Sequence, residues 1–534
     1  MKERRKRNGK KKAVLALALA LLIVVGIIPM DSTEMCVKAA DKIYGEDTPT
    51  LPTYSIEPTY NEGRYLVPVA DGKYPVVIFL HGSDGQKSVE TNNFRAKMEK
   101  WVSSGFVDPV ILIMPTIQQI QEPAYGQDDF RDFVSEGYLE DLVNFLKDDT
   151  KLDVHPWKKK IDKTKVDTIV GVSMGGAAAM YAGMKLPKIF KNVGGFSPAQ
   201  CFYMDGATEW YWVRDNELLN YSNDQGAHMM LAYGEGEIDQ FSHPKTGAAN
   251  RYFRAINRRE SNQNKFLMYH APKTVNGSQQ IGHGYLVFFR ELFCYLYYLK
   301  YNALPTAELI EQAMGYGGDF PSQDPDLQVS KKRLLLQDTI SISFMVPKSA
   351  INGKYHDPYL VVTHEGADTK LTEYVESGDM LVFTYRVVPY QIGDEVSAVP
   401  YALREDGSKV IGVPIRYSVA DYCYSLLSKE DYQGSKYATL RRLLVDILRY
   451  GDAAQMYQDY RANVPASGNL TSAQNAMGTD VNAAMTYNTV KEQNYKTVSS
   501  AEELAKIESA MLFWRRRSMF DSGSARTARL TFAW

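Results

Sequence analysis

Cysteine is scarce in this chain of 534 residues, which contains only four. Cys36 lies in an N-terminal segment that we expect to be removed, and Cys201, Cys294 and Cys423 are far apart and odd in number. Disulfides are therefore excluded as the main source of stability. No two cysteines have the spacing of a zinc site, and we predict neither a metal nor another cofactor.

The chain also lacks an excess of charge of one sign, since its net charge is −2. A balance this close to neutral argues against the basic surface that binds nucleic acid, so no nucleic-acid partner is expected. The apolar share of 45% is ordinary for a globular protein. The length predicts two to four domains, because a compact domain seldom exceeds about 250 residues.

A long hydrophobic run occurs near the N-terminus, where the basic segment MKERRKRNGKKK is followed by AVLALALALLIVVGII. Val37 and Ala39 are small residues just before a cleavage site at Ala40, so residues 1–39 are predicted to be a signal peptide. The alternative is an uncleaved membrane anchor, because the run nearly reaches spanning length. We expect a secreted or cell-surface protein, and the scarcity of cysteine suits a Gram-positive bacterium.

Residues 63–302 alternate between apolar runs and helical patterns, after an extended lead-in at 40–62. Unbroken apolar runs are typical of strands that are buried on both faces of a sheet. The alternation predicts an α/β fold, with a parallel sheet flanked by helices. The expected strands are YPVVIFL (74–80), PVILIMP (109–115), VDTIVGV (166–172), NVGGFS (192–197), AHMMLAYG (227–234) and KFLMYHA (265–271).

The pattern changes after residue 303. We expect a linker at 303–333 and a smaller, mainly β accessory module at 334–463, in which TISISFMV and DMLVFTYRVVPY alternate with turns. Two helical patterns, VADYCYSLLSK and YATLRRLLVDILRYGDAAQMYQDY, close the module. Residues 464–534 are expected to be a polar linker followed by a tail.

The segment VDTIVGVSMGGAAAMYAG predicts a strand, a sharp turn and a helix, with Ser173 at the turn. Gly171 and Gly175 complete the pattern G-x-S-x-G of a nucleophile elbow. There the serine takes a strained backbone conformation, and the neighbouring chain approaches so closely that only glycine fits. The alternative is a tight turn without chemistry, which the position between an apolar strand and a small-residue helix disfavours.

A nucleophilic serine needs an oxyanion hole. FLHGSDG (79–85) ends the first strong strand, and its glycines let the loop fold back, so we expect the Ser83 N–H to donate to the oxyanion. The Met174 N–H, at the start of the helix, is the second expected donor. His81 is expected to hold this loop in place rather than to act as the base.

The acid and the base are expected in the order Ser, acid, His. His283 is the best candidate for the base, because it lies between glycines in a loop after the last apolar strand and just before a helix. The acid is expected in GEGEIDQF, where three carboxylates compete to orient the histidine. Asp239 is favoured, and Glu237 and then Glu235 remain alternatives.

Residues 63–301 resemble the esterase D-like branch of the α/β-hydrolases through YPVVIFLHGSDG, GVSMGGAAAMY followed by PKIFKNVGGFSPA, and IGHGYLVFFREL. That branch includes feruloyl and acetylxylan esterases, S-formylglutathione hydrolases, enterochelin esterases and mycolyltransferases. The resemblance implies a serine esterase that uses Ser173 and His283, and DQF is similar to the family's Asp followed by an aromatic residue, which supports Asp239. Secreted members usually cleave esters on plant polysaccharide, which implies a polysaccharide-linked ester as substrate.

The segment CFYMDGATEWYWVRDNELLNY (201–221) lies where this branch builds its substrate rim. Trp210, Tyr211 and Trp212 could stack on a sugar or an aromatic acyl group, or the segment could be a packed cap. Two other functions stay open. One is an acyltransferase of the same fold, and the other is a non-catalytic carbohydrate- or surface-binding protein on a hydrolase scaffold.

Residues 334–461 resemble a module of surface proteins of gut Clostridia, through SISFMV, YSVADYCYSLL and LLVDILRYGDAAQMYQDY. The resemblance implies contact with a cell surface or a glycan. The final segment, 510–534, fits no element, and we expect it to be truncated or out of frame. Codons that are permitted for the residues from Trp514 onward, read in a frame shifted back by one nucleotide, can encode Leu-Glu-Ala-Ala-Val-Asn-Val-Arg-Phe. This sequence is similar to LQDTISISF (336–344), so we expect that the intact protein begins a second copy of the β module here.

Overall fold

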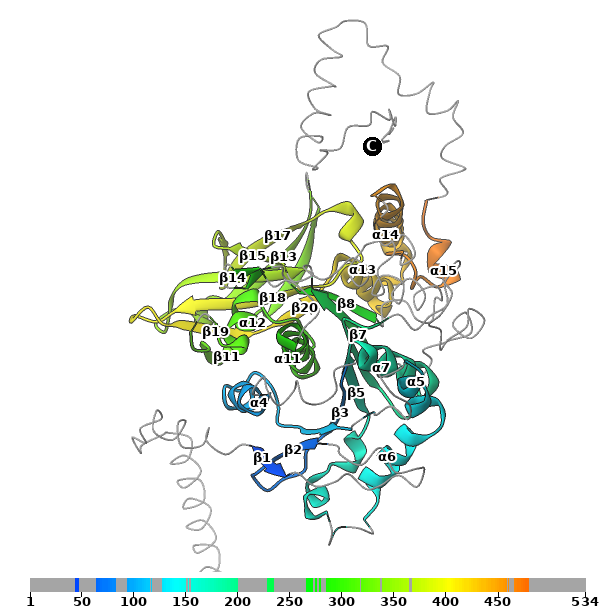
Figure 1. Ribbon diagram of the computed structural model, residues 1–534. Coiled ribbons are helices and arrows are strands. Elements are labelled where there is room, and N and C mark those ends of the chain that lie inside the picture. Colours follow the sequence, from blue (N-terminus) through cyan, green and yellow to red (C-terminus); the bar gives the residue numbers. More distant parts are fainter. Residues whose placement is uncertain are drawn as a thin grey trace, which may run out of the picture. The chain divides into compact units, whose positions relative to one another are not determined.

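Figure 1 shows the computed structural model of the chain as a ribbon diagram. The described residues are 44–47, 64–82, 94–115, 117, 127–149, 152, 155–199, 228–234, 266–271, 274–275, 278–279, 285–316, 318–336, 339–364, 367–458, 460 and 465–479. The expected signal peptide at 1–39 and the expected tail at 510–534 lie outside them. The chain divides into two compact units, residues 1–425 with 448–469 and residues 426–447 with 470–534.

The first unit contains an eight-stranded sheet in the order β1-β2-β4-β3-β5-β6-β7-β8. β2 pairs antiparallel with β1 and β4, and the other neighbours are parallel. The strands are β1 (Tyr44–Asp47), β2 (Arg64–Pro68), β3 (Val76–Leu80), β4 (Ile111–Met114), β5 (Thr168–Val172), β6 (Asn192–Phe196), β7 (His228–Gly234) and β8 (Phe266–Ala271). β5 lies in the middle of the parallel part, so its C-terminal end is central on the edge where ligands bind in open α/β sheets.

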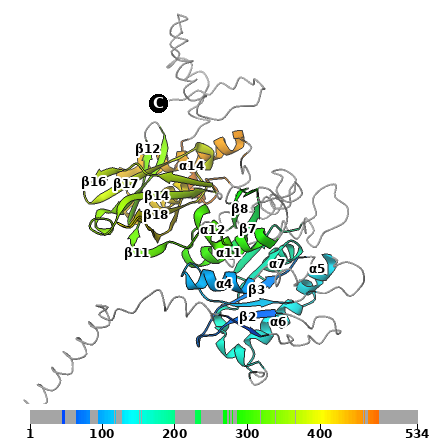
Figure 2. The same cartoon turned by 60° about the vertical axis from the view of Figure 1, so that its left-hand side comes forward.

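Helices cover both faces of this sheet (Figure 2). Ile78 belongs to the core that β3 shares with α5, α6 and α7, whereas the adjacent Val77 belongs to the core shared with α4 and α11. The alternation shows that this apolar run is buried on both faces, as predicted. The helices are α4 (Phe94–Ser103), α5 (Gln127–Ser135), α6 (Tyr138–Lys147), α7 (Met174–Lys185) and α11 (Tyr285–Tyr301).

A mainly β region follows, as predicted, and forms two sheets. One has the order β11-β19-β18-β14-β15, with β20 also paired to β18, and the other has the order β12-β13-β17-β16. The pairing is antiparallel except between β11 and β19. The strands are β11 (Ser322–Gln328), β12 (Lys331–Leu336), β13 (Ile340–Pro347), β14 (His356–His364), β15 (Ala367–Leu371), β16 (Val375–Ser377), β17 (Met380–Val387), β18 (Val396–Leu403), β19 (Lys409–Val413) and β20 (Ile415–Tyr417).

The segment 303–333, expected to be a linker, instead contains α12 (Ala307–Met314), β11 and the start of β12. α12 forms because Thr306 caps it by accepting a hydrogen bond from the Leu309 N–H. Its apolar side then enters the core that α4 and α11 share with the sheet. The expected lead-in at 40–62 likewise contains β1, which extends the sheet at its edge.

Three further helices and a two-stranded sheet are also described. The helices that follow β20 in the chain are α13 (Val419–Leu427), α14 (Ala438–Gln458) and α15 (Ser472–Asn475), and the two-stranded sheet consists of β9 (Thr274–Val275) and β10 (Ser278–Gln279). α13 and α14 match the two expected helices, whereas α15 and its Thr471 capping box fall in the expected polar linker. Among the described residues, helices are all too short or too polar to cross a membrane.

Candidate active site

Ser173 is the single residue between β5 and α7, and its backbone has φ 54° and ψ −118°. A serine at the start of a helix usually has extended backbone angles and uses its hydroxyl to cap the first turn. In the described structure the Ser173 hydroxyl forms no such bond with α7. The side chain is also partly exposed. The hydroxyl is therefore not used by the helix that it begins, which is the state that a nucleophile requires.

The glycines around Ser173 are required by close backbone contacts. A Cβ on Gly171 would lie 2.1 Å from the carbonyl oxygen of Gly175. A Cβ on Gly175 would lie 2.3 Å from the carbonyl oxygen of His81, and one on Gly176 would lie 3.0 Å from that of Phe196. Backbone atoms cannot rotate away as side chains can, so larger residues are excluded at positions 171 and 175 and disfavoured at position 176. The steric argument made from the pattern G-x-S-x-G is thus confirmed.

Three hydrogen bonds hold the strained backbone of Ser173. Its N–H donates to the Phe196 carbonyl at 3.0 Å, and its carbonyl accepts from the N–H groups of Ala199 at 2.8 Å and Ala177 at 3.0 Å. The turn after β6 and the first turn of α7 therefore fix the residue from two sides. A backbone conformation of this kind persists only where its surroundings determine it, and such conformations gather at active sites.

Met174 is the first residue of α7, so its N–H belongs to the first turn, which a helix cannot satisfy internally. Such a group, at the positive end of the helix dipole, is suited to an anionic oxygen. The end of β3 lies beside this first turn of α7, since a Cβ on the next residue, Gly175, would lie only 2.6 Å from the carbonyl carbon of Leu80. Ser83, the other expected donor, lies outside the described residues.

His81 has the structural role that the sequence predicts. It is 1% exposed, and its Nε2 accepts a hydrogen bond from the Ile117 N–H at 2.9 Å. Its Nδ1 lies 2.6 Å from the Gly82 carbonyl, which can only accept, so Nδ1 carries the proton. The ring thus joins the end of β3 to the segment after β4 in one neutral tautomer, and neither nitrogen is available to serve as a base.

The other expected triad residues lie outside the described part of the chain. These residues are His283, Asp239, Glu237 and Glu235, and the expected rim residues Trp210, Tyr211 and Trp212 lie outside it too. The structure describes the elements that flank them. β7 ends at Gly234, β8 ends at Ala271 and α11 begins at Tyr285. β5 to β8 are consecutive parallel strands, so their C-terminal ends lie on the edge that carries Ser173.

A buried polar pair near Ser173 was not expected from the sequence. Ser197, directly after β6, has φ 43°, and its hydroxyl donates to Glu291 Oε1 at 3.2 Å. Both residues are fully buried. A signal for this pair was present in FFRELF, where a carboxylate interrupts the apolar face of a predicted helix, but nothing in the sequence names its partner.

The thiols and histidines of the described residues offer no second centre. Cys294 and Cys423 are buried thiols that form no disulfide, and burial raises the pKa of Cys423 to about 12, which keeps it protonated. His356 and His364 begin and end the nine-residue strand β14, so they are too far apart to bind one ion. Within the described residues, no three potential metal ligands cluster.

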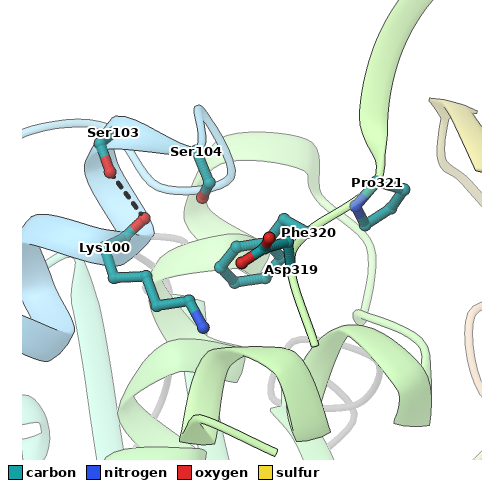
Figure 3. Close-up of a pocket in the computed structure, with 6 residues that line it drawn as sticks. All are labelled: Lys100, Ser103, Ser104, Asp319, Phe320 and Pro321. Atoms are coloured by element: carbon teal, nitrogen blue, oxygen red, sulfur yellow. Dashed lines mark hydrogen bonds between the residues drawn. The ribbon is translucent and has the colours of Figure 1, made fainter. Parts of the chain in front are cut away.

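A pocket of about 280 Å³ lies at the C-terminal end of α4 (Figure 3). Its lining residues are Lys100, Ser103, Ser104, Asp319, Phe320 and Pro321. In the chain, α4 follows the C-terminal end of β3 and precedes the N-terminal end of the parallel strand β4. Its last turn, and hence the pocket, therefore lies at the edge opposite Ser173 and is no part of the candidate active site.

Part of the chain matches a known protein family. Residues 63–285 match a family described as "Putative esterase". This segment is therefore similar to an esterase family, which supports a carboxylic ester hydrolase. A search of curated proteins found no match.

Solved structures similar to this chain include a ferulic acid esterase from Anaeromyces mucronatus in complex with ferulic acid, at 16% identity and TM-score 0.36, with 48% of this chain and 90% of that chain covered. The feruloyl esterase module from Clostridium thermocellum complexed with sinapinate matches at 12% identity and TM-score 0.31, with coverage of 52% and 88%. Esterase Est22 with p-nitrophenol matches at 15% identity and TM-score 0.30, with 54% of this chain and 87% of that chain covered. Similarities this distant carry no argument about the substrate.

Proposed function

We propose that this chain is a secreted serine esterase that hydrolyses carboxylic esters through an acyl-enzyme. The observation that carries the proposal is the conformation of Ser173, which combines a positive φ with a hydroxyl that does not cap its own helix. A serine that only closed a turn would need neither feature. The match of residues 63–285 to an esterase family supports the same chemistry.

In the proposed reaction, the Ser173 hydroxyl attacks the ester carbonyl carbon while the His283 imidazole takes its proton. Asp239, or Glu237 in its place, accepts a hydrogen bond from His283 and fixes its tautomer. The histidine then gives the proton to the leaving alcohol, and the acyl group remains on Ser173. Water that His283 activates attacks this acyl-enzyme and releases the acid.

The developing negative charge is proposed to lie on an oxygen that accepts hydrogen bonds from the N–H groups of Met174 and Ser83. The Met174 N–H is supported by its position at the first turn of α7. Donors that are fixed before the reaction cost no reorganisation when the charge develops, and each is typically worth about 10²- to 10³-fold in kcat. The bonds that hold His81 support a fixed loop on the other side.

The proposed substrate is an acyl ester on plant polysaccharide, with a feruloyl or an acetyl group. The predicted signal peptide would deliver the enzyme to such a polymer outside the cell. Trp210, Tyr211 and Trp212 are proposed to stack on the sugar or the aromatic acid. The β region after residue 334 is proposed to contact a glycan or the cell surface.

Hydrolysis of p-nitrophenyl acetate tests the proposal, with a stopped-flow record of the first turnover. We expect a burst of p-nitrophenol equal to the enzyme concentration, and Ser173→Ala should lower kcat at least about 10⁴-fold without changing the melting temperature. Ser103→Ala, at an exposed serine on α4, is the matched control and should be fully active. Activity of Ser173→Ala within tenfold of the wild type would exclude the proposed nucleophile.

Two further sets of measurements define the acid and the substrate. Among Asp239→Asn, Glu237→Gln and Glu235→Gln, one variant should lose most of its activity, and equal mild losses for all three would contradict a triad acid in this segment. Methyl ferulate, acetylated xylan and short p-nitrophenyl esters should give clearly different kcat/KM values. A lack of activity on both methyl ferulate and acetylated xylan would contradict the proposed feruloyl or acetyl ester while leaving the esterase itself in place.

A further inference from the structure

Ser197 lies directly after β6 in a backbone conformation that serine adopts only at a cost. Its φ is 43°, in the left-handed region, and the residue is fully buried. Its N–H donates to the Ala232 carbonyl at 2.7 Å. Its hydroxyl donates to Glu291, with the two carboxylate oxygens at 3.2 Å and 3.5 Å. Glycine would relieve the backbone strain, so the serine is there for its hydroxyl.

The turn that contains Ser197 also holds the nucleophile. Phe196, the residue before it, accepts the hydrogen bond from the Ser173 N–H, and Ala199, two residues after it, donates to the Ser173 carbonyl. Residues 196–199 therefore form a cradle for the two peptide groups of Ser173. A shift of this turn would move the backbone of Ser173 and with it the direction of the hydroxyl.

Glu291 is a carboxylate without solvent exposure on α11, next to residues of an apolar core. A buried carboxylate is costly unless it is paired or hydrogen-bonded, so an apolar residue would serve the packing of α11 better. Ser197 is one of its partners. The pair thus joins the cradle of Ser173 to the helix that begins two residues after His283 in the sequence.

We infer that Ser197 and Glu291 are positioning residues for the esterase reaction. Their hydrogen bond fixes the cradle at residues 196–199 against α11 and so holds the Ser173 hydroxyl in its reactive direction. This inference rests on the proposed function, since it concerns the reactivity of Ser173. It predicts that loss of the Ser197 hydroxyl lowers the reactivity of each correctly folded site and not only the number of such sites.

The test measures kcat per active site, with sites counted by the p-nitrophenol burst, and the rate at which a fluorophosphonate labels Ser173. Ser197→Ala should lower both quantities about ten- to hundred-fold with KM unchanged, because small misplacements of a reacting group cost about that much. Ser197→Gly removes the hydroxyl and relieves the backbone strain, so it should show the same loss even if the alanine variant folds poorly.

Variants of Glu291 and a control complete the test. Glu291→Gln keeps an acceptor oxygen and should retain kcat within about threefold, whereas Glu291→Met should lose as much as Ser197→Ala. The double variant should lose less than the product of the two single losses, because the bond between Ser197 and Glu291 is counted in both single variants. Ser343→Ala is the matched control, since its buried hydroxyl has no hydrogen-bond partner in the described structure, and kcat should not change.

The outcomes separate this inference from the proposed function. If the wild type is labelled at Ser173 but Ser197→Ala and Ser197→Gly keep the wild-type kcat per site and labelling rate, the inference is wrong and the esterase stands. If fluorophosphonate does not label the wild type at Ser173, the proposed nucleophile itself is wrong.

Discussion

The Cβ that Gly175 lacks would lie 2.3 Å from the carbonyl oxygen of His81. The carbonyl oxygen of Leu80 would be 2.4 Å away. This contact joins the first turn of α7 to the end of β3, which are far apart in the sequence. The close approach places the start of the expected oxyanion loop next to Ser173, and it requires that residue 175 has no side chain.

Gly175→Ala should therefore abolish esterase activity and destabilise the protein strongly. Overpacking of a core typically costs about 1–3 kcal/mol and sometimes more, and here two backbone carbonyls would have to move. Gly434→Ala is the matched control, since a Cβ there would meet no described atom within 4 Å and its φ is −63°. Urea denaturation and p-nitrophenyl acetate hydrolysis measure the two effects. Equal behaviour of the two variants would contradict the close approach.

His81→Ala should destabilise the protein by about 1–3 kcal/mol, because the buried Ile117 N–H would lose its acceptor. Activity should fall as well, since the ring also holds the Gly82 carbonyl at the start of the oxyanion loop. His228→Ala is the control, because His228 is exposed at the start of β7 and should change stability by less than about 0.5 kcal/mol. An active, fully stable His81→Ala variant would show that this ring does not support the loop.

The sequence predicted the elements whose pattern is local. The strands β3 to β7 are apolar runs because they are buried on both faces of the sheet, and β8 also follows an apolar run of the sequence. α4, α6, α7 and α11 have clear helical patterns. β11 was missed because its sequence, SQDPDLQ, has no apolar alternation. That strand forms because its backbone pairs with β19 so closely that a Cβ on Gly412 would lie 1.8 Å from the Leu327 carbonyl oxygen.

The candidate site divides in the same way. Ser173 and its glycines could be predicted, because the steric demands of the turn act on neighbours in the sequence. The bond between Ser197 and Glu291 could not be predicted, since it joins residues 94 positions apart across the core. The assignment of His283 and Asp239 stays a prediction, because both lie outside the described residues.

Tyr401→Ala should destabilise the esterase domain together with the β region. Tyr401 is 1% exposed, and its hydroxyl lies 2.9 Å from that of Thr306, which caps α12. Its ring shares one core with Trp101 of α4 and Phe293 of α11. Removal of a large buried ring typically costs about 3–5 kcal/mol.

The measurement compares the loss of esterase activity with the loss of near-UV circular dichroism during urea denaturation. In Tyr401→Ala, the two signals should be lost at the same, lower urea midpoint. Tyr401→Phe loses only one hydrogen bond, so the free energy of unfolding from either signal should fall by about 1 kcal/mol. Activity that survives well above the urea midpoint of the near-UV transition would show that the shared core does not couple the two parts of the chain.

The last prediction concerns Glu395 and the pH dependence of stability. Burial raises the pKa of Glu395 to about 7, although Arg416 opposes the shift, and Asp421 and Asp394 add to it. Arg416 Nη1 lies 3.0 Å from the carboxylate. The pKa of a glutamate in the unfolded chain is about 4.3, so the folded protein binds the proton more tightly than the unfolded chain does. Protonation of Glu395 therefore stabilises the fold at low pH, and this contribution is lost as the pH rises through about 7.

The free energy of unfolding of the wild type should fall between pH 5 and pH 8 by about 2–3 kcal/mol more than that of Glu395→Gln, since one pKa unit corresponds to about 1.4 kcal/mol. The amide cannot ionise, so the variant should gain relative stability at pH 8. Glu376→Gln, at an exposed carboxylate that pairs with Lys348, is the control and should follow the wild type. Urea denaturation at pH 5, 6, 7 and 8 gives the three curves. Parallel curves for the wild type and Glu395→Gln would mean that the carboxylate is already ionised in the folded protein at pH 5, with its pair to Arg416 outweighing its burial.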